Sequence, residues 1–148
     1  MKKTTDKLTE QLYCQTNGIV LLDGYSGCGK TTLLRNLKQA SYRPVYLLSY
    51  RDVVDVMLCA AQRNKTCERH LLELSRGNCI IGIEDVDYLR GKETTQKWLA
   101  EMVQAAAGKH LVILTGNDVQ RKTPALTSLR GMDIFTCVDT ESRQSRSA

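Results

Sequence analysis

The sequence predicts a doubly wound α/β domain in which helices cover both faces of a parallel sheet of about five strands. Short runs that are apolar throughout recur along the chain, and segments with helical spacing of apolar residues separate them. Strands that are buried on both faces read as continuous apolar runs, as parallel strands do. Right-handed crossovers then place the intervening helices on both sides of the sheet. A length of 148 residues fits one such domain.

Five apolar runs are the predicted strands, and four segments between or after them are the predicted helices. The strands are expected at residues 18–23 (GIVLLD), 44–50 (PVYLLSY), 79–86 (CIIGIEDV), 110–118 (HLVILTGND) and 133–139 (DIFTCVD). The helices are expected at residues 30–40, 52–64, 67–78 and 94–109.

The rest of the composition sets limits on the class of protein. We expect an N-terminal extension over residues 1–16, a core domain over 17–140 and a flexible polar tail over 141–148. The six cysteines include no C-x-x-C pair and the chain has two histidines, which argues against a zinc site. No apolar run approaches the roughly 20 residues that span a bilayer, and no signal peptide is visible, so we expect a cytoplasmic protein. A net charge of +5 permits an anionic partner without requiring one.

A Gly-rich loop follows the first predicted strand and opens the first predicted helix. Its sequence, GYSGCGKTT, matches the phosphate-binding Walker A pattern G-x-x-x-x-G-K-T in full. Glycines let backbone N–H groups point at phosphate oxygens, and the helix dipole adds positive potential there. Lys30 is expected to reach the β- and γ-phosphates, and the Thr31 hydroxyl to bind Mg²⁺. The predicted nucleotide ligands are Gly24, Tyr25, Ser26, Gly27, Cys28, Gly29, Lys30, Thr31 and Thr32.

Acidic and polar side chains end two other predicted strands, at the edge where parallel sheets bind ligands. Glu84 and Asp85 follow the run CIIGI, and we assign the magnesium position to Glu84 and the catalytic position to Asp85. Asp87 lies two residues further on and could instead be a simple helix-start acid. Asn117 follows the run LVILT, where it either contacts the γ-phosphate or the attacking water, or only forms a turn with Asp118.

The order of these features resembles the AAA+ ATPase core of the DnaA-like replication initiators, together with Hda-type regulators and DnaC-type helicase loaders. The stretch GKETTQ after the acidic strand is the most telling local match, and the resemblance covers about residues 17–140. It implies a P-loop NTPase three-layer sandwich with strand order 5-1-4-3-2, and ATP with Mg²⁺ as ligands. It places Asn117 near the sensor 1 position. It also implies an initiator or helicase partner and an AAA+-type homo- or hetero-oligomer.

In the resembling proteins, the segment after the second strand contacts single-stranded DNA. Here that segment spans about residues 52–77, and Arg63, Lys65 and Arg69 are the candidate DNA-binding residues. The alternative is that they form a solvated helix face. No aromatic residue lies in this segment, so we do not expect it to stack on bases.

Three departures from the family pattern concern catalysis. Glu84 replaces the first aspartate of the usual acid pair, and Met132 stands where the arginine finger is expected, which leaves Arg130 as the candidate substitute. We also expect neither the α-helical lid nor the helix-turn-helix domain within these residues. The sequence therefore supports a weak or partner-dependent ATPase in DNA replication or its regulation. The alternatives are a non-hydrolysing regulatory or loader-type module and a small P-loop kinase.

Overall fold

The computed structural model describes residues 10–12, 14–24, 29–41, 43–61 and 77–136. Its centre is a five-stranded parallel sheet in the order β2-β3-β4-β1-β5. This is the predicted order 5-1-4-3-2 read from the other edge, so the predicted P-loop NTPase fold is confirmed. The strands are β1 (Gly18–Asp23), β2 (Val45–Ser49), β3 (Ile80–Glu84), β4 (Leu111–Gly116) and β5 (Met132–Thr136).

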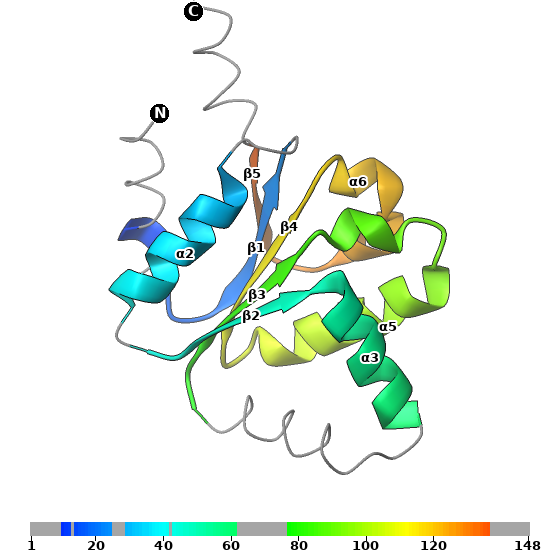
Figure 1. The fold of residues 1–148 in the computed structure, drawn as a ribbon, viewed down its shortest axis with the longest axis horizontal. Helices are drawn as coiled ribbons and strands as arrows, with labels where there is room; N and C mark the ends of the chain where they lie inside the picture. Colours follow the sequence, from blue (N-terminus) through cyan, green and yellow to red (C-terminus); the bar gives the residue numbers. More distant parts are fainter. Residues whose placement is uncertain (1–9, 13, 25–28, 42, 62–76, 137–148) are drawn as a thin grey trace, which may run out of the picture.

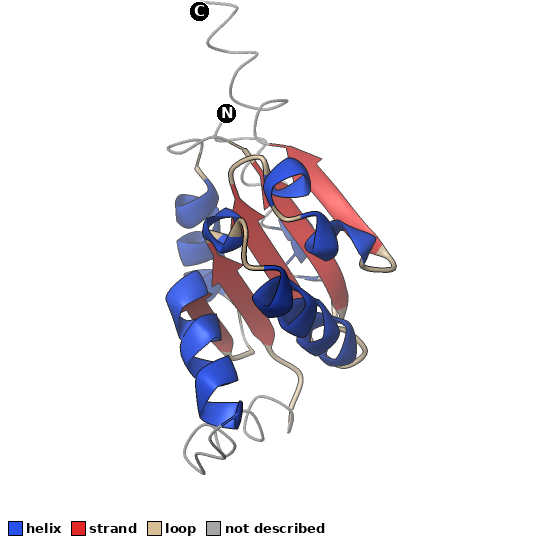
Figure 2. Ribbon diagram, turned by 90° about the vertical axis from the view of Figure 1, so that its right-hand side faces the viewer, coloured by secondary structure: helices blue, strands red, loops and turns tan. Residues whose placement is uncertain are grey.

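Helices form the outer two layers, as Figures 1 and 2 show. In Figure 1, α2 lies on one side of the sheet, and α3, α5 and α6 lie on the other. The helices are α2 (Lys30–Ala40), α3 (Tyr50–Ala61), α5 (Glu93–Ala106) and the short α6 (Val119–Lys122). Two 3-10 helices, η1 (Val86–Leu89) and η2 (Pro124–Ser128), complete the second layer.

Two hydrophobic cores fill the spaces between the layers, because alternate strand residues point to opposite faces. Val20 and Leu22 of β1 pack with Leu34 and Leu37 of α2. Ile19 and Leu21, on the opposite face of β1, join a larger cluster that includes Val53 of α3, Leu99 and Val103 of α5, and Val119 of α6. The apolar runs predicted a parallel sheet with helices on both faces, and this prediction is confirmed.

The boundaries differ from the expected ones in a few places. Tyr50 was expected to end the second strand, and it instead begins α3. The third strand ends at Glu84, so Asp85 belongs to the turn that follows. The elements η1, α6 and η2 were not predicted, because pieces of four or five residues carry no clear periodicity. The helix expected over 67–78 falls mostly on residues 62–76, outside the described part of the chain.

A buried arginine ties the N-terminal residues to the amino edge of the sheet. Arg43 is 6% exposed, and its guanidinium donates hydrogen bonds to the backbone oxygens of Leu12, Gln15 and Thr16. It also donates to Asn78 Oδ1 at 2.8 Å. One side chain thus satisfies several carbonyls at the end of a helical segment, where intrahelical partners run out.

A buried Cys–His contact lies at the same edge. The backbone N–H of Cys79 donates to His110 Nδ1 at 3.2 Å, and the Cys79 Sγ lies 3.3 Å from the same nitrogen. Burial raises the pKa of the Cys79 thiol and lowers the pKa of His110. Both shifts favour the neutral forms, so this pair is a packing feature of the fold. None of the helices in the described residues is long and apolar enough to cross a bilayer.

Candidate nucleotide-binding site

The carboxyl ends of β1, β3 and β4 meet at one edge of the sheet, because the three strands are parallel and in register. A cavity of about 360 Å³ lies at this edge. The segments that border it come from three parts of the chain that are far apart in sequence. Its lining residues are Gly29, Lys30, Thr31, Thr32, Asp85, Asp87, Tyr88, Asn117 and Lys122.

The start of α2 forms the phosphate-loop wall of the cavity. Gly29 has φ 103°, a left-handed conformation that favours glycine, and its carbonyl accepts the Leu33 N–H at 2.9 Å. The N–H groups of the first helical turn therefore face the cavity end of α2, where the helix dipole is positive. Gly24 is tied to the neighbouring strand through a hydrogen bond from its N–H to Gly116 O at 3.0 Å. Tyr25, Ser26, Gly27 and Cys28, also predicted as nucleotide ligands, lie outside the described residues.

Lys30, the lysine of the motif, borders the cavity and donates a hydrogen bond to Gly24 O. The lysine side chain thus bends back toward Gly24, the first residue of the motif. Thr32 lines the cavity as well, one residue beyond Thr31. Of the motif residues that the structure describes, Gly29, Lys30, Thr31 and Thr32 line the cavity.

The two predicted magnesium ligands are brought together. The Thr31 hydroxyl donates to Glu84 Oε1 at 3.2 Å, although the two residues lie 53 positions apart. A hydroxyl and one carboxylate fit Mg²⁺, which is commonly held by one or two protein oxygens together with phosphates and water. Among the described residues, no three His, Cys, Asp or Glu side chains gather into a site built for metal alone. The longer glutamate side chain is compatible with this contact.

Asp85 lines the cavity from the turn between β3 and η1. Its backbone is left-handed, with φ 60° and ψ 40°, which is uncommon for a residue other than glycine, asparagine or aspartate. The Asp85 carbonyl accepts the N–H of Tyr88 at 3.0 Å and so starts η1. This turn separates the two neighbouring acids: Glu84 contacts Thr31, and Asp85 faces the cavity.

Asn117 lines the cavity from the turn after β4. The next residue, Asp118, has a left-handed backbone conformation with φ 56°. Beyond it, the N–H of Val119 donates to Asp23 Oδ1 at 3.2 Å. Asp23 ends the strand that leads into the phosphate loop. The position of Asn117 is therefore coupled to that strand through one side-chain hydrogen bond.

Sequence reasoning did not assign three of the cavity residues to the site. Asp87 does stand in the first turn of a helix, as interpreted, but its side chain is 7% exposed and lines the cavity. Lys122 belongs to α6, which was not predicted, so nothing placed it there. Tyr88 is 61% exposed, and its ring centroid lies 4.9 Å from that of Tyr50. The only available signal was that Asp87 and Tyr88 follow the acid pair closely.

Arg130 does not line the cavity. Its backbone N–H donates to Gln104 Oε1 at 3.1 Å, and it lies just before β5. Met132 is in register with Ile19 near the start of β1, whereas the phosphate loop follows the end of that strand. Arg130 thus lies toward the opposite edge of the sheet. Arg63, Lys65 and Arg69, the candidate DNA-binding residues, lie outside the described part of the chain.

Several solved structures share this fold. Replication initiator DnaA bound to AMPPCP and single-stranded DNA is 18% identical with a TM-score of 0.66, and the match covers 98% of this chain and 50% of that one. AMPPCP-bound DnaA from Aquifex aeolicus is 22% identical with a TM-score of 0.66, covering 95% and 47%. Domain III of DnaA from Thermotoga maritima is 15% identical with a TM-score of 0.68, covering 98% and 67%.

The chain thus spans about half the length of the two nucleotide-bound DnaA structures, at 50% and 47%. No curated protein sequence gives a significant match. At the level of sequence families, residues 20–140 match the ATPase family associated with various cellular activities (AAA). That match covers most of the chain, including the acid pair and the Asn117 turn. The chain therefore belongs to the AAA family of ATPases, and its fold is that of the DnaA AAA+ core.

Proposed function

We propose that this chain binds Mg·ATP and acts in DNA replication or its regulation as an ATPase that is weak or depends on a partner. One observation carries the proposal: Lys30, Thr31, Asp85 and Asn117 follow three strand ends and line one cavity. Glu84 contacts Thr31 there through a hydrogen bond. A lysine, an oxygen pair for a cation, a carboxylate and an amide are the groups that phosphoryl transfer to water requires. For such a role the chain would work in the cytoplasm.

Each side chain has a specific task in this proposal. The first N–H groups of α2 and the Lys30 ammonium hold the phosphate oxygens. Thr31 and Glu84 hold Mg²⁺, which neutralises charge on the β- and γ-phosphates when bound. Asp85 orients the attacking water and accepts its proton. Asn117 donates its amide N–H to the γ-phosphate or to that water.

Fast hydrolysis commonly uses an arginine beside the transferred phosphate. Among the described residues that line the cavity, the cations are Lys30 and Lys122, and none is an arginine. Because Arg130 lies toward the other edge of the sheet, it would act only on a nucleotide bound by another molecule. An arginine supplied in this way is worth roughly 10³- to 10⁵-fold in rate. We therefore expect slow turnover by the isolated chain and faster turnover in an AAA+-type homo- or hetero-oligomer.

The same observation favours a second candidate function, a regulatory or helicase-loader-type module that binds ATP without hydrolysing it. Steady-state hydrolysis of Mg·ATP separates the two. A catalytic chain should exceed the Asp85→Asn variant, alone or with single-stranded DNA. Turnover that never rises above that variant would favour the binding module, whose partner would be a replication initiator or helicase.

Nucleotide binding itself is tested by calorimetric titration with Mg·ATP. The Lys30→Ala variant should lose binding, because Lys30 lines the cavity and its ammonium is the proposed phosphate ligand. Lys38→Ala is the matched control, since Lys38 is exposed in the last turn of the same helix. Equal affinity of the wild type and Lys30→Ala would contradict the proposal.

We also propose that the chain contacts single-stranded DNA through Arg63, Lys65 and Arg69. One relative of the same fold is described as bound to single-stranded DNA, and the exposed Tyr88 lies beside Tyr50, at the start of the helix that leads into this basic segment. DNA affinity should fall with rising salt and after neutralisation of the three residues together. Affinity that is insensitive to both changes would refute the DNA-binding proposal alone.

A further inference from the structure

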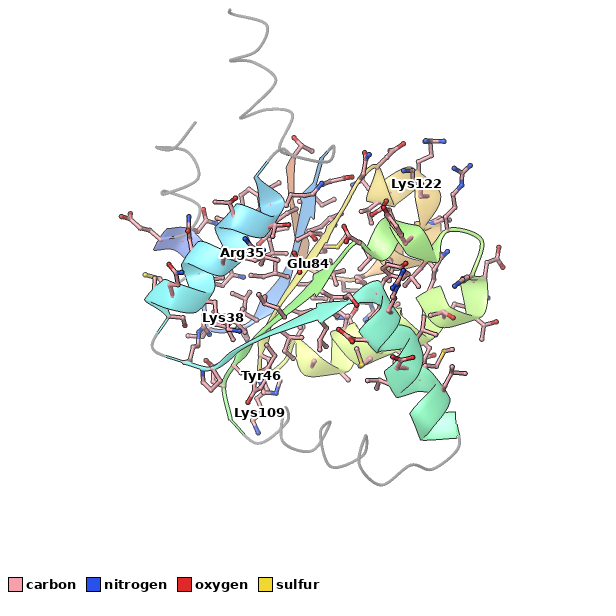
Figure 3. All side chains as sticks on the ribbon, in the orientation of Figure 1. Arg35, Lys38, Tyr46, Glu84, Lys109 and Lys122 are labelled. Carbon is pink, nitrogen blue, oxygen red and sulfur yellow. The ribbon has the colours of Figure 1, made fainter. Side chains whose placement is uncertain are left out.

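The cavity contains a cation that is not part of the phosphate-loop motif. Lys122 is the last residue of α6, its side chain is 21% exposed, and it lines the cavity together with Lys30 and Asn117. Figure 3 shows it on α6, at the opposite end of the sheet from Lys109. Two lysines thus line this cavity, Lys30 from the first turn of α2 and Lys122 from the end of α6.

A buried carboxylate holds Lys122 at this place. Lys122 Nζ lies 3.8 Å from Asp87 Oδ2, and the Asp87 side chain is 7% exposed. Asp87 cannot easily move away, because it is packed against the end of β4. A Cβ atom at Gly116 would lie 2.8 Å from Asp87 Oδ1 and 3.3 Å from its backbone nitrogen. The carboxylate is therefore fixed, and its charge keeps the ammonium group nearby.

The backbone beneath Lys122 is fixed as well. The Lys122 N–H donates to Asp118 O at 3.1 Å. The next residue, Thr123, is fully buried and bonds Val119 O through both its N–H, at 2.8 Å, and its hydroxyl, at 2.7 Å. The backbone of Lys122 is therefore held in place, and its side chain is the part that can change position. Lys122 lies five positions after Asn117 in the sequence.

The contact between Lys122 and Asp87 is loose. A separation of 3.8 Å is longer than a hydrogen bond, so this ion pair leaves the ammonium group able to donate elsewhere. A terminal phosphate carries more negative charge than one carboxylate and offers three acceptor oxygens. In a partly enclosed cavity, such a group would attract the ammonium more strongly than Asp87 does.

We propose that Lys122 is a second phosphate-binding residue, which distinguishes a nucleoside triphosphate from a diphosphate, and that Asp87 positions it. Without the third phosphate, Lys122 stays beside Asp87. With it, the ammonium turns to the terminal phosphate oxygens while the buried carboxylate remains within reach. This inference rests on the proposed nucleotide site. It adds a ligand for the terminal phosphate from within the same chain, from α6 rather than from the phosphate-loop motif.

The test compares the affinities for AMPPCP and ADP, both measured with Mg²⁺ by calorimetric titration. Lys122→Met removes the charge and keeps most of the stem. It should weaken AMPPCP binding about 10-fold, the order of one charge-assisted hydrogen bond, and change ADP binding by less than about twofold. Lys122→Arg should keep the preference for AMPPCP. Arg121→Met, a neighbouring charge that does not line the cavity, is the matched control and should alter neither affinity.

The outcomes separate this inference from the proposed function. If Lys122→Met weakens AMPPCP and ADP equally, Lys122 only supports the fold, and the inference is overturned. It is also overturned if neither affinity changes. Should Lys122→Met fail to fold, Lys122→Gln serves in its place with the same expected split. If the wild type binds neither nucleotide, or Lys30→Ala binds both as well as the wild type, the nucleotide site itself is wrong.

Discussion

Gly116 is the position where one added methyl group should disturb the site most. It ends β4, just before Asn117, and its N-terminal neighbours are fixed in the sheet. A Cβ atom there would lie 2.5 Å from Val119 Cγ2, 2.8 Å from Asp87 Oδ1 and 3.3 Å from the Asp87 backbone nitrogen. Two of these distances are more than half an ångström inside ordinary contact, and one neighbour is backbone. Gly116→Ala must therefore push the η1 turn and the Asn117 turn apart.

The expected cost follows from this overlap. Inserting a methyl group into a packed interior typically costs about 1–3 kcal/mol. Val119 and Asp87 are both buried, so their room to move is small, and we expect about 2 kcal/mol at Gly116. For a chain of this size, that corresponds to a fall in Tm of roughly 4–8 °C. Since Asn117 and Asp87 line the cavity, nucleotide affinity should fall as well.

The assay is urea unfolding followed by circular dichroism, with Gly108→Ala as the control. A Cβ atom at Gly108 would meet only Ala105 O, at 3.9 Å, so that variant should be neutral within about 0.5 kcal/mol. A Gly116→Ala variant as stable as the wild type, with unchanged nucleotide affinity, would show that the two turns are not packed as described. Equal destabilisation by Gly116→Ala and Gly108→Ala would show that the loss of stability does not come from the overlap with Val119 and Asp87.

Three further perturbations test other parts of the structure. Arg43→Met should lower the free energy of unfolding by about 2–3 kcal/mol in urea titrations, because it removes the donors that satisfy the carbonyls of Leu12, Gln15 and Thr16. Burial lowers the pKa of His110, so this side chain takes up a proton at higher pH in the unfolded state than in the folded state. The stability that His110 contributes should therefore be complete above about pH 6.5 and should fall as the pH drops below that value. His110→Asn should reduce this fall in unfolding curves recorded from pH 7.5 to 5. Thr31→Val should weaken Mg·ATP binding about 10-fold and leave magnesium-free ATP binding nearly unchanged in a titration, because Thr31 shares its proposed cation site with Glu84.

Each of these has its own control and its own contrary result. Arg35→Met replaces an exposed arginine on α2 and should change stability by less than about 0.5 kcal/mol. A similar loss of stability in Arg35→Met and Arg43→Met would show that the buried hydrogen bonds of Arg43 are not the cause. An unaltered pH profile in His110→Asn would mean that another group controls acid sensitivity. A Thr31→Val variant that loses magnesium-free binding equally would place the defect in the loop rather than at the cation.

The site was largely predictable because it depends on strand ends. Parallel strands place their carboxyl ends at one edge, so the phosphate loop, the acid pair and Asn117 could be brought together from the sequence alone. Lys122 could not be assigned to the site in this way, because α6 has four residues and shows no clear periodicity in the sequence. The position of α6 also depends on the left-handed turn at Asp118, which the sequence does not reveal. The sequence also could not predict that Arg130 lies away from the cavity, because the position of Arg130 depends on the register of β5 with β1.

The boundary at Tyr50 shows the other limit of sequence patterns. The run PVYLLSY is apolar enough to read as strand throughout, yet Asp52 accepts the Ser49 N–H at 2.8 Å and starts a helix there. A short polar side chain three residues on thus overrides the strand pattern. The ring of Tyr50 lies beside that of Tyr88, and Tyr88 lines the cavity.

A crystal structure of the chain with AMPPCP and Mn²⁺ in place of Mg²⁺ tests the central claim most directly, because anomalous scattering locates the metal independently. The account predicts the phosphates in the cavity between Lys30 and Asn117, with the metal beside Thr31 Oγ1 and Glu84. The Lys122 ammonium group should lie closer to the terminal phosphate than to the Asp87 carboxylate. Nucleotide bound elsewhere, or a metal away from the Thr31–Glu84 pair, would contradict it.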